Sequence, residues 1–300
     1  MKEKSLILNE FHLKLIAILT MTIDHVGYFL QAYATTNQIM SEVGLVFRII
    51  GRISFPIFIF MLAEGLRKTH DRLNYILRIA ILWAIVFIIQ FIVNQTRIFG
   101  LSMPNAQAFT DLLCFALFIY LIEKKNWLKV LAILPLGFIV LSYAMQVSEI
   151  YAYANNMTST WSTFIPEWAR CAYSLYGFLM FLGIYYAKPI ALSILNKMEK
   201  KEEIDMSQFK EGRKLQMLLN TISITSIVII TIIFWAIGYF VPSIDPYFTI
   251  LPQSYAVIAS LAIAFYNGER GYNKKWFKYA SYFYYPLHIA LIGIIFGLIF

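Results

Sequence analysis

The first long apolar run reads Leu13-Lys-Leu-Ile-Ala-Ile-Leu-Thr-Met-Thr-Ile-Asp-His-Val-Gly27 and stays mostly apolar as far as Tyr33. A helix needs about 20 consecutive, mostly apolar residues to cross the hydrocarbon core of a bilayer. Residues 13–33 provide that length. The run holds Asp24 and His25 in its middle, and no small-residue cleavage site follows it, as it would in a signal peptide. We therefore expect it to remain as the first membrane-spanning helix.

The rest of the chain repeats this pattern of long apolar runs separated by short polar segments. Of the 300 residues, 60% are hydrophobic and 14% are charged, which is more apolar than an ordinary soluble domain. We predict an all-α, polytopic transmembrane helix bundle with about nine spans, within a range of eight to ten. The predicted spans are residues 13–33, 43–65, 74–94, 107–123, 127–146, 169–190, 215–240, 247–266 and 279–299.

The predicted spans form one domain over residues 1–300. Helices 1–6 occupy residues 13–190, and helices 7–9 occupy residues 215–300. The stretch between them, residues 191–214, alternates in charge sign, which is typical of a solvated segment. We predict that it is a cytoplasmic linker.

The distribution of Lys and Arg predicts the orientation, because cytoplasmic loops of membrane proteins retain positive charge. With a cytoplasmic N-terminus, 21 of the 25 basic residues fall at the inner face, and Phe300 falls outside. Only Arg97 and Arg170 fall in outer loops, while Arg48 and Arg52 lie within the second span. The net charge of +8 is dispersed between apolar runs instead of covering one face, so we expect no nucleic-acid partner.

Ionisable residues inside the first span are functional candidates, because each costs free energy unless it is paired or faces water. Lys14 and His25 lie eleven residues apart, which places them on nearly the same helix face with about 16 Å of rise between them. We predict Lys14 at the cytoplasmic rim and His25 near the middle of the membrane. Asp24 points to another side, where we expect it to orient a partner on a different helix. A structural contact between helices is the alternative.

The second span contains Phe47-Arg-Ile-Ile-Gly-Arg-Ile-Ser-Phe-Pro-Ile-Phe-Ile-Phe-Met-Leu-Ala-Glu-Gly65. Arg48 and Arg52 are four residues apart and share a helix face. Arginine keeps its charge, so Arg52 must meet a carboxylate, backbone carbonyls or water. Asp24 at similar depth is the expected partner, and a structural bridge without a catalytic part is the alternative.

Two further features lie near the cytoplasmic face. Glu64, at the end of the second span, is placed to pair with Lys14 or Arg270, whereas rim charges often only mark topology. Arg270 belongs to Tyr266-Asn-Gly-Glu-Arg-Gly271, whose two glycines predict a tight loop that a ligand can approach closely. The alternative is an ordinary glycine turn.

The last span begins with Tyr279-Ala-Ser-Tyr-Phe-Tyr-Tyr-Pro-Leu-His288. His288 lies about 12 to 15 Å into this span. His25, Arg52 and His288 are therefore expected at one depth, around a cavity that opens to the cytoplasm.

These stretches resemble the TraX family, membrane proteins named for the enzyme that acetylates the N-terminus of conjugative pilin. The first helix also resembles the transmembrane acyltransferase superfamily, in which a basic residue precedes a histidine by ten intervening positions, as Lys14 precedes His25. The stretches that carry the TraX resemblance are Leu13–Gly27 with Met21-Thr-Ile-Asp-His25, Gly51-Arg-Ile-Ser-Phe-Pro56 with Ala63-Glu-Gly65, and Tyr266–Gly271 with Tyr285-Pro-Leu-His288.

The resemblance implies an acyltransferase of the bacterial inner membrane, with acetyl-CoA as the acyl donor and without a metal. Its acceptor would be an amine or hydroxyl, such as a peptide N-terminus or a glycan or lipid hydroxyl. Cations at the rim suit the phosphates of CoA. The residues expected to act are His25, Asp24, Arg52 and His288 in catalysis; Lys14, Glu64, Arg67, Lys68, Asn267, Arg270 and Lys274 in acetyl-CoA binding; and Arg48 and Tyr285 in substrate binding.

Two other classes of function fit the intramembrane charges alone. In a secondary transporter, the Asp, His, Arg and Glu side chains would line a proton or substrate path. In a pure interaction protein, they would be structural bridges between helices. Only the enzyme has a reason to bind acetyl-CoA, so a binding measurement separates the three.

Overall fold

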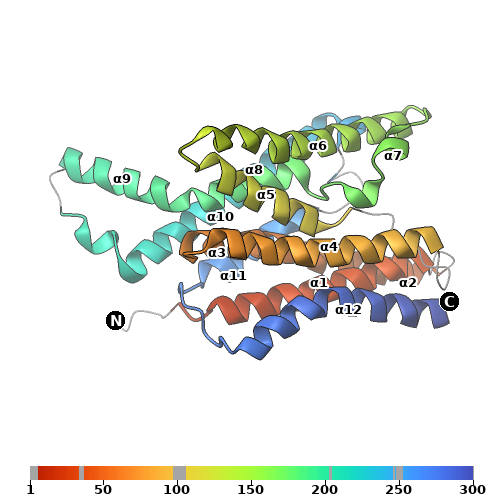
Figure 1. The fold of residues 1–300 in the computed structure, drawn as a ribbon, viewed down its shortest axis with the longest axis horizontal. Helices are drawn as coiled ribbons and strands as arrows, with labels where there is room; N and C mark the ends of the chain where they lie inside the picture. The colour runs from red at the N-terminus through yellow and green to blue at the C-terminus, as the bar shows by residue number, and fades with distance from the viewer. Residues whose placement is uncertain are drawn as a thin grey trace.

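Long helices lie side by side along the longest dimension of the molecule (Figure 1). The computed structural model describes residues 6–33, 37–96, 106–202, 205–245, 247 and 253–299. Across these ranges the chain forms α-helices, 3₁₀-helices and two isolated β-bridges, and no β-strand. The predicted all-α class is confirmed. Arg97 and Phe300, which entered the topology prediction, lie outside the described residues.

The helices follow the apolar runs of the sequence. They are α1 Glu10–Tyr33, α2 Gln38–Gly51, α3 Ser54–Lys68, α4 Arg72–Thr96, α5 Ala108–Ile122, η2 Trp127–Ala132, α6 Ile133–Ala154, α7 Trp161–Phe164, η3 Glu167–Ala169, α8 Ser174–Tyr185, α9 Ala187–Glu202, η4 Ser207–Phe209, α10 Gly212–Phe240, η5 Pro242–Ile244, η6 Gln253–Ile258, α11 Ala259–Ala264 and α12 Lys275–Ile299.

The number of membrane crossings is smaller than predicted when only long helices are counted. In the described part of the chain, six segments are long and apolar enough to cross a membrane: Glu10–Ala32, Gln38–Lys68, Arg72–Thr96, Trp127–Ala154, Gly212–Phe240 and Lys275–Ile299. α8 and the following helix add a seventh if they form one span with a 45° bend, while α5 and the segment Gln253–Ala264 are apolar but shorter. Nine crossings and the cytoplasmic N-terminus stay predictions.

The predicted linker at residues 191–214 is partly helical in the structure, and its cytoplasmic location stays a prediction. Its first part is helical, because α9 continues to Glu202 and carries Lys200 and Lys201 in its last turn. Basic residues in the last turn of a helix interact favourably with the negative end of its dipole.

The second predicted span is interrupted between α2 and α3. Pro56 has no backbone N–H for the Arg52 carbonyl one turn earlier, and its ring crowds that carbonyl. The chain therefore turns at Arg52 and Ile53, and α3 begins at Ser54, which places the proline in a first turn where it is tolerated. The interruption puts Arg52 at a helix end in the interior, where only 3% of the residue is exposed.

α3 lies at the centre of the bundle. Ten of its 15 residues are buried, as expected for a helix that is apolar on most sides. It contacts α1, α5, α8 and α11. The surrounding core includes Phe55, Phe60, Phe115, Tyr176 and Phe181. Polar residues that flank α3 are consequently held inside the protein.

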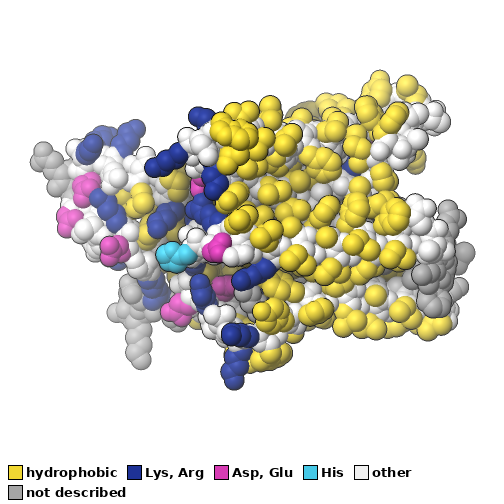
Figure 2. Space-filling model, viewed as in Figure 1, with side chains coloured by type: hydrophobic (Ala, Val, Ile, Leu, Met, Phe, Trp, Pro, Cys, Tyr) yellow, Lys and Arg dark blue, Asp and Glu magenta, His cyan; other side chains and the backbone are white. Residues whose placement is uncertain are grey.

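Charged and apolar side chains occupy different parts of the surface. Figure 2 shows Lys and Arg gathered toward one end and hydrophobic side chains over the rest of the visible face. We call the first region the basic end; α1, α4 and α12 begin there with Lys14, Arg72 and Lys275 near their starts. Large apolar side chains such as Phe283 and Leu298 are 68% and 77% exposed, as in a helix that faces lipid. The chain has the character of a multi-pass membrane protein.

Candidate functional site

A cavity of about 1060 Å³ runs through the bundle. Its wall reaches from Lys14 and Arg270 at the basic end to Glu149 and Glu167 toward the opposite end. Ten of the residues predicted from the sequence line it: Lys14, Asp24, His25, Arg48, Arg52, Glu64, Lys68, Arg270, Lys274 and Tyr285. The other three, Arg67, Asn267 and His288, lie outside its wall.

The two histidines form a hydrogen-bonded pair between α1 and α12. The Nδ1 atom of His25 lies 2.8 Å from the Nε2 atom of His288, and Nδ1 of His288 lies 2.8 Å from the carbonyl oxygen of Tyr284. A carbonyl only accepts, so His288 donates from Nδ1, and its Nε2 accepts when the ring is neutral. His25 then donates from Nδ1, which leaves the Nε2 lone pair of His25 unused by this chain of bonds.

A second contact fixes the same pair of helices. The hydroxyl of Thr22 donates to the carbonyl of Ile18 at 2.8 Å, so the Tyr284 hydroxyl, 2.7 Å away, is the donor in their mutual bond. The ring of Tyr284 also stacks on His288, with 4.9 Å between centroids. His288 therefore stands behind His25, buried and oriented from two sides, while His25 faces the cavity.

Asp24 forms ion pairs with both arginines of the second predicted span. Its Oδ2 atom accepts from Arg48 at 2.6 Å, and its Oδ1 atom accepts from Arg52. The expected pairing with Arg52 is present, and Arg48, which we assigned to substrate binding, shares the same carboxylate. The close approach requires Gly51, because a Cβ there would stand 2.2 Å from Asp24. Both oxygens of Asp24 thus face arginines, and neither orients His25.

Arg52 has a further partner that sequence reasoning missed. Its guanidinium donates to Oε1 of Gln253 at 3.2 Å and from Nε to the Arg48 carbonyl at 3.0 Å. Gln253 lies in the short helix η6 and lines the cavity. A single glutamine in an apolar run carries no motif, so the sequence offered no signal for it.

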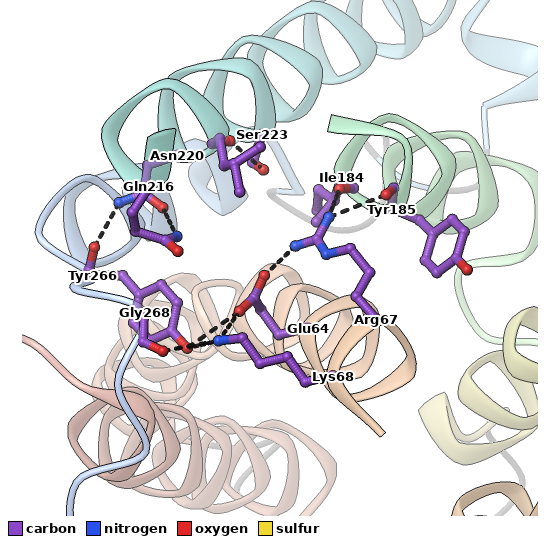
Figure 3. A network of polar contacts seen from close by, with 11 residues as sticks. Glu64, Arg67, Lys68, Ile184, Tyr185, Gln216, Asn220, Ser223, Tyr266 and Gly268 are labelled. Carbon is purple, nitrogen blue, oxygen red and sulfur yellow. Dashed lines mark hydrogen bonds and ion pairs between the residues drawn. The ribbon is translucent and has the colours of Figure 1, made fainter. Parts of the chain in front are cut away.

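The charges around Glu64 form a separate polar network, shown in Figure 3. Glu64 pairs with Arg67 and Lys68 from its own helix, whereas pairing with Lys14 or Arg270 was expected. Residues three and four apart share a helix face, which explains why Glu64 pairs with Arg67 and Lys68. Arg67 also donates to the carbonyl of Ile184 at 2.6 Å, where α8 ends. Arg67 is therefore engaged in a structural contact away from the cavity.

Lys68 and the polar loop before α12 belong to the same network (Figure 3). Lys68 donates to the carbonyl of Gly268 at 2.9 Å and to the Tyr266 hydroxyl at 3.2 Å. From α10, Asn220 donates to the Tyr266 carbonyl at 2.8 Å. Gly268 and Gly271 have φ angles of +82° and +65°, so the predicted tight glycine loop is present.

The loop is also joined to the start of the chain. Backbone bonds connect Leu8 to Phe265 and Asn267, and Glu10 to Glu269, at 2.8–3.0 Å. The Asn267 side chain accepts from the Glu269 backbone at 2.9 Å, which is a local turn contact. Its predicted role in acetyl-CoA binding has no support from its position.

Besides Lys68, which bonds to the polar loop, four cations line the cavity at the basic end: Lys14, Arg78, Arg270 and Lys274. Lys14 has a long contact of 3.5 Å with Glu10. Arg78 was missed in the sequence, because a basic residue near the end of a span was explained by topology alone. These side chains come from α1, α4 and the segment before α12, so three separate parts of the chain converge on this opening.

Toward the opposite end, a buried carboxylate fixes one wall of the cavity. Asp111 of α5 is fully buried and accepts backbone bonds from Ala172 and Ser174, each at 2.7 Å, and from Tyr173 at 3.1 Å. Acidic side chains satisfy free N–H groups at the start of a helix, here α8. The ring of Tyr173 lines the cavity and stacks on Phe55 at 3.5 Å.

Comparison with known proteins identifies the family. The profile of the TraX protein family matches residues 10–199, a range that holds α1 to α3 with His25, Asp24 and Arg52 but not His288. No curated protein matches the chain, and no solved structure does. Because the matched range covers more than half of the 300 residues, the chain belongs to the TraX family.

Proposed function

We propose that this protein is a membrane-embedded acyltransferase that moves an acetyl or short acyl group from the matching acyl-CoA, such as acetyl-CoA, to an amine or hydroxyl acceptor. The observation that carries the proposal is the series of two hydrogen bonds that joins the Tyr284 carbonyl to His288 and His288 to His25. It leaves Nε2 of His25 as a proton acceptor at the wall of a large cavity. A histidine oriented in this way is the usual general base of acyl transfer.

The donor would enter from the basic end. Lys14, Arg78, Arg270 and Lys274 would bind the phosphates of CoA, since cations recognise phosphate by charge and hydrogen bonds. Lys14 and His25 are eleven residues apart on one helix, about 16 Å along its axis. The pantetheine arm would span this distance and bring the thioester to His25. By the charge distribution, this entrance would face the cytoplasm of a bacterial cell.

The chemical step would use groups at the depth of His25. Nε2 of His25 would take a proton from the acceptor, whose nitrogen or oxygen then attacks the thioester carbonyl. The carbon–sulfur bond breaks, and the thiolate of CoA takes the proton back from the imidazolium. His288 would stabilise that imidazolium through its accepting Nε2, as a positioning residue. Arg52, held by Asp24 and Gln253, would stabilise the oxyanion.

A secondary transporter is the second candidate, favoured by one observation. The cavity wall includes residues near both ends of the bundle, from Lys14 to Glu149, as a permeation path would require. A transporter of another solute has no need of a base held by a second histidine, and no reason to bind CoA.

Binding of acetyl-CoA to the purified protein tests the proposal. The melting temperature should rise with acetyl-CoA concentration, because a ligand that binds only the folded state stabilises it. Arg78→Met and Arg270→Met should each weaken binding by about tenfold, the effect of one charge-assisted contact. Lys129→Met, at the same end but outside the cavity wall, is the control and should bind normally. Absence of binding by the wild type would refute the enzyme and leave the transporter.

A further inference from the structure

Glutamine side chains in the cavity wall differ in how far their amides are satisfied. Gln146 donates to the carbonyl of Cys171 at 2.8 Å and accepts from the hydroxyl of Ser174 at 2.9 Å, so both ends of its amide are used. Gln253 uses its oxygen to bind Arg52. Gln107 lines the same cavity and behaves differently.

Neither polar atom of the Gln107 amide has a hydrogen-bond partner within the described part of the chain. Only 5% of the residue is exposed. It stands at the N-cap of α5, but its side chain makes no capping bond. A buried amide without partners costs free energy and is rare in folded proteins. A partner supplied by a ligand would remove that cost.

Gln107 is connected to the proposed reaction centre through two neighbouring aromatic rings. Two residues after it, the ring of Phe109 meets the ring of Tyr285 with 4.3 Å between centroids. Tyr285 in turn contacts the ring of His25 edge-on at 6.1 Å. The free amide therefore belongs to the part of the cavity where the acyl group would be transferred, and not to the phosphate-binding opening.

We infer that the carboxamide of Gln107 binds a secondary amide group of a substrate, an inference that rests on the proposed function. A carboxamide offers an acceptor and donors in one plane, which a secondary amide matches with its own N–H and carbonyl. An isolated hydroxyl or a phosphate would not use both the acceptor and the donors of the carboxamide in this planar arrangement. Two sources place such a group near the reacting atoms. The pantetheine arm of CoA has an amide one ethylene link from the sulfur, and a peptide acceptor has one next to its α-carbon.

Substitution by methionine, which keeps the length and removes the amide, separates ligand binding from a structural role. Gln107→Met should leave the melting temperature of the unliganded protein unchanged or raise it, because a buried amide without partners is lost. Gln146→Met is the matched control in the same wall, and should lower the melting temperature because its partners lose their bonds. A lower melting temperature for Gln107→Met would assign Gln107 a structural role and overturn the inference.

Binding measurements identify which amide is bound. If it is the amide of the donor, Gln107→Met should weaken the binding of CoA about tenfold. It should leave the binding of adenosine 3′,5′-bisphosphate, which lacks the pantetheine arm, unchanged. If it is the amide of an acceptor, Gln107→Met should leave CoA binding unchanged and weaken the binding of trialanine about tenfold. The depsipeptide analogue of trialanine, in which an ester replaces the first amide, should then bind with equal affinity to the wild type and to Gln107→Met. Equal affinities of both proteins for CoA and for trialanine would overturn the inference, whereas a wild type that binds no CoA refutes the proposed function itself.

Discussion

The hydrogen bond between His25 and His288 gives the two histidines different roles in the proposed mechanism. If His288 only orients His25 and stabilises its imidazolium, His288→Leu should lower kcat on the order of 100-fold, within the range of general acid–base catalysis, and leave KM for acetyl-CoA unchanged. His288→Gln restores an accepting oxygen near the lost Nε2 and should recover part of the rate. Steady-state kinetics of the two variants check this. Equal rates for His288→Leu and the wild type would remove His288 from the mechanism.

The carboxylate of Asp24 is held by two arginines across a glycine. Gly51→Ala would place a Cβ 2.2 Å from Asp24, so the ion pairs with Arg48 and Arg52 would be displaced. Breaking a buried ion pair costs about 3–5 kcal/mol. The control is Gly137→Ala in α6, where a new Cβ meets nothing within 4 Å and should stabilise the helix by up to about 1 kcal/mol. Thermal unfolding in detergent measures both; equal melting temperatures would contradict the geometry.

The contacts of single residues were predicted best where a buried charge required an oppositely charged partner. Asp24 and Arg52 had to meet because neither charge can face lipid, and they do. Arg48 was assigned to a substrate because the sequence does not say that one carboxylate serves two arginines. Gln107 and Gln253 carry no charge and match no motif, so only the folded chain shows them. The catalytic and binding roles stay predictions.

Lys68 at the end of α3 and Arg270 in the loop before α12 are expected to differ, with Lys68 stabilising the fold and Arg270 binding the ligand. Lys68→Met should destabilise the protein by about 1–3 kcal/mol, because Glu64 and the carbonyl of Gly268 lose a donor. Arg270→Met should leave stability nearly unchanged, since Arg270 lines the cavity and forms no ion pair within the described part of the chain. Thermal unfolding without ligand distinguishes them. A larger loss of stability for Arg270→Met than for Lys68→Met would contradict this division.

Whole helices were predicted well where an apolar run was long, and less well where a tertiary contact or proline decided the boundary. α1, α4 and α12 match their predicted spans closely. Pro56 interrupts the second span, which hydropathy alone does not register. The charged stretch after α8 was predicted as a linker without an assigned secondary structure, and α9 extends into it, because alternating charges suit an exposed helix as well as a coil.

The complete molecule is predicted to have its basic end in the cytoplasm. Ser207 lies in η4 between α9 and α10, and 21 of the 25 basic residues would share its side of the membrane. A Ser207→Cys variant should resist a membrane-impermeant thiol reagent in intact cells and react after permeabilisation. The buried Cys114 and Cys171 are replaced by Ala to avoid background. Labelling of Ser207→Cys in intact cells would reverse the orientation and the side from which the acyl donor enters.

The proposed mechanism depends most on His25 acting as the base of acyl transfer. The direct measurement is the release of free CoA thiol from acetyl-CoA by purified protein, with hydroxylamine as a small acceptor, after subtraction of the spontaneous release measured without protein. The wild type should release thiol. The His25→Ala variant should bind acetyl-CoA with unchanged affinity but release thiol at least about 100-fold more slowly. Lys14, one of the proposed phosphate-binding cations, lies about 16 Å away along the helix axis, so binding should survive the substitution. Equal thiol release by wild type and a folded His25→Ala protein would contradict the mechanism.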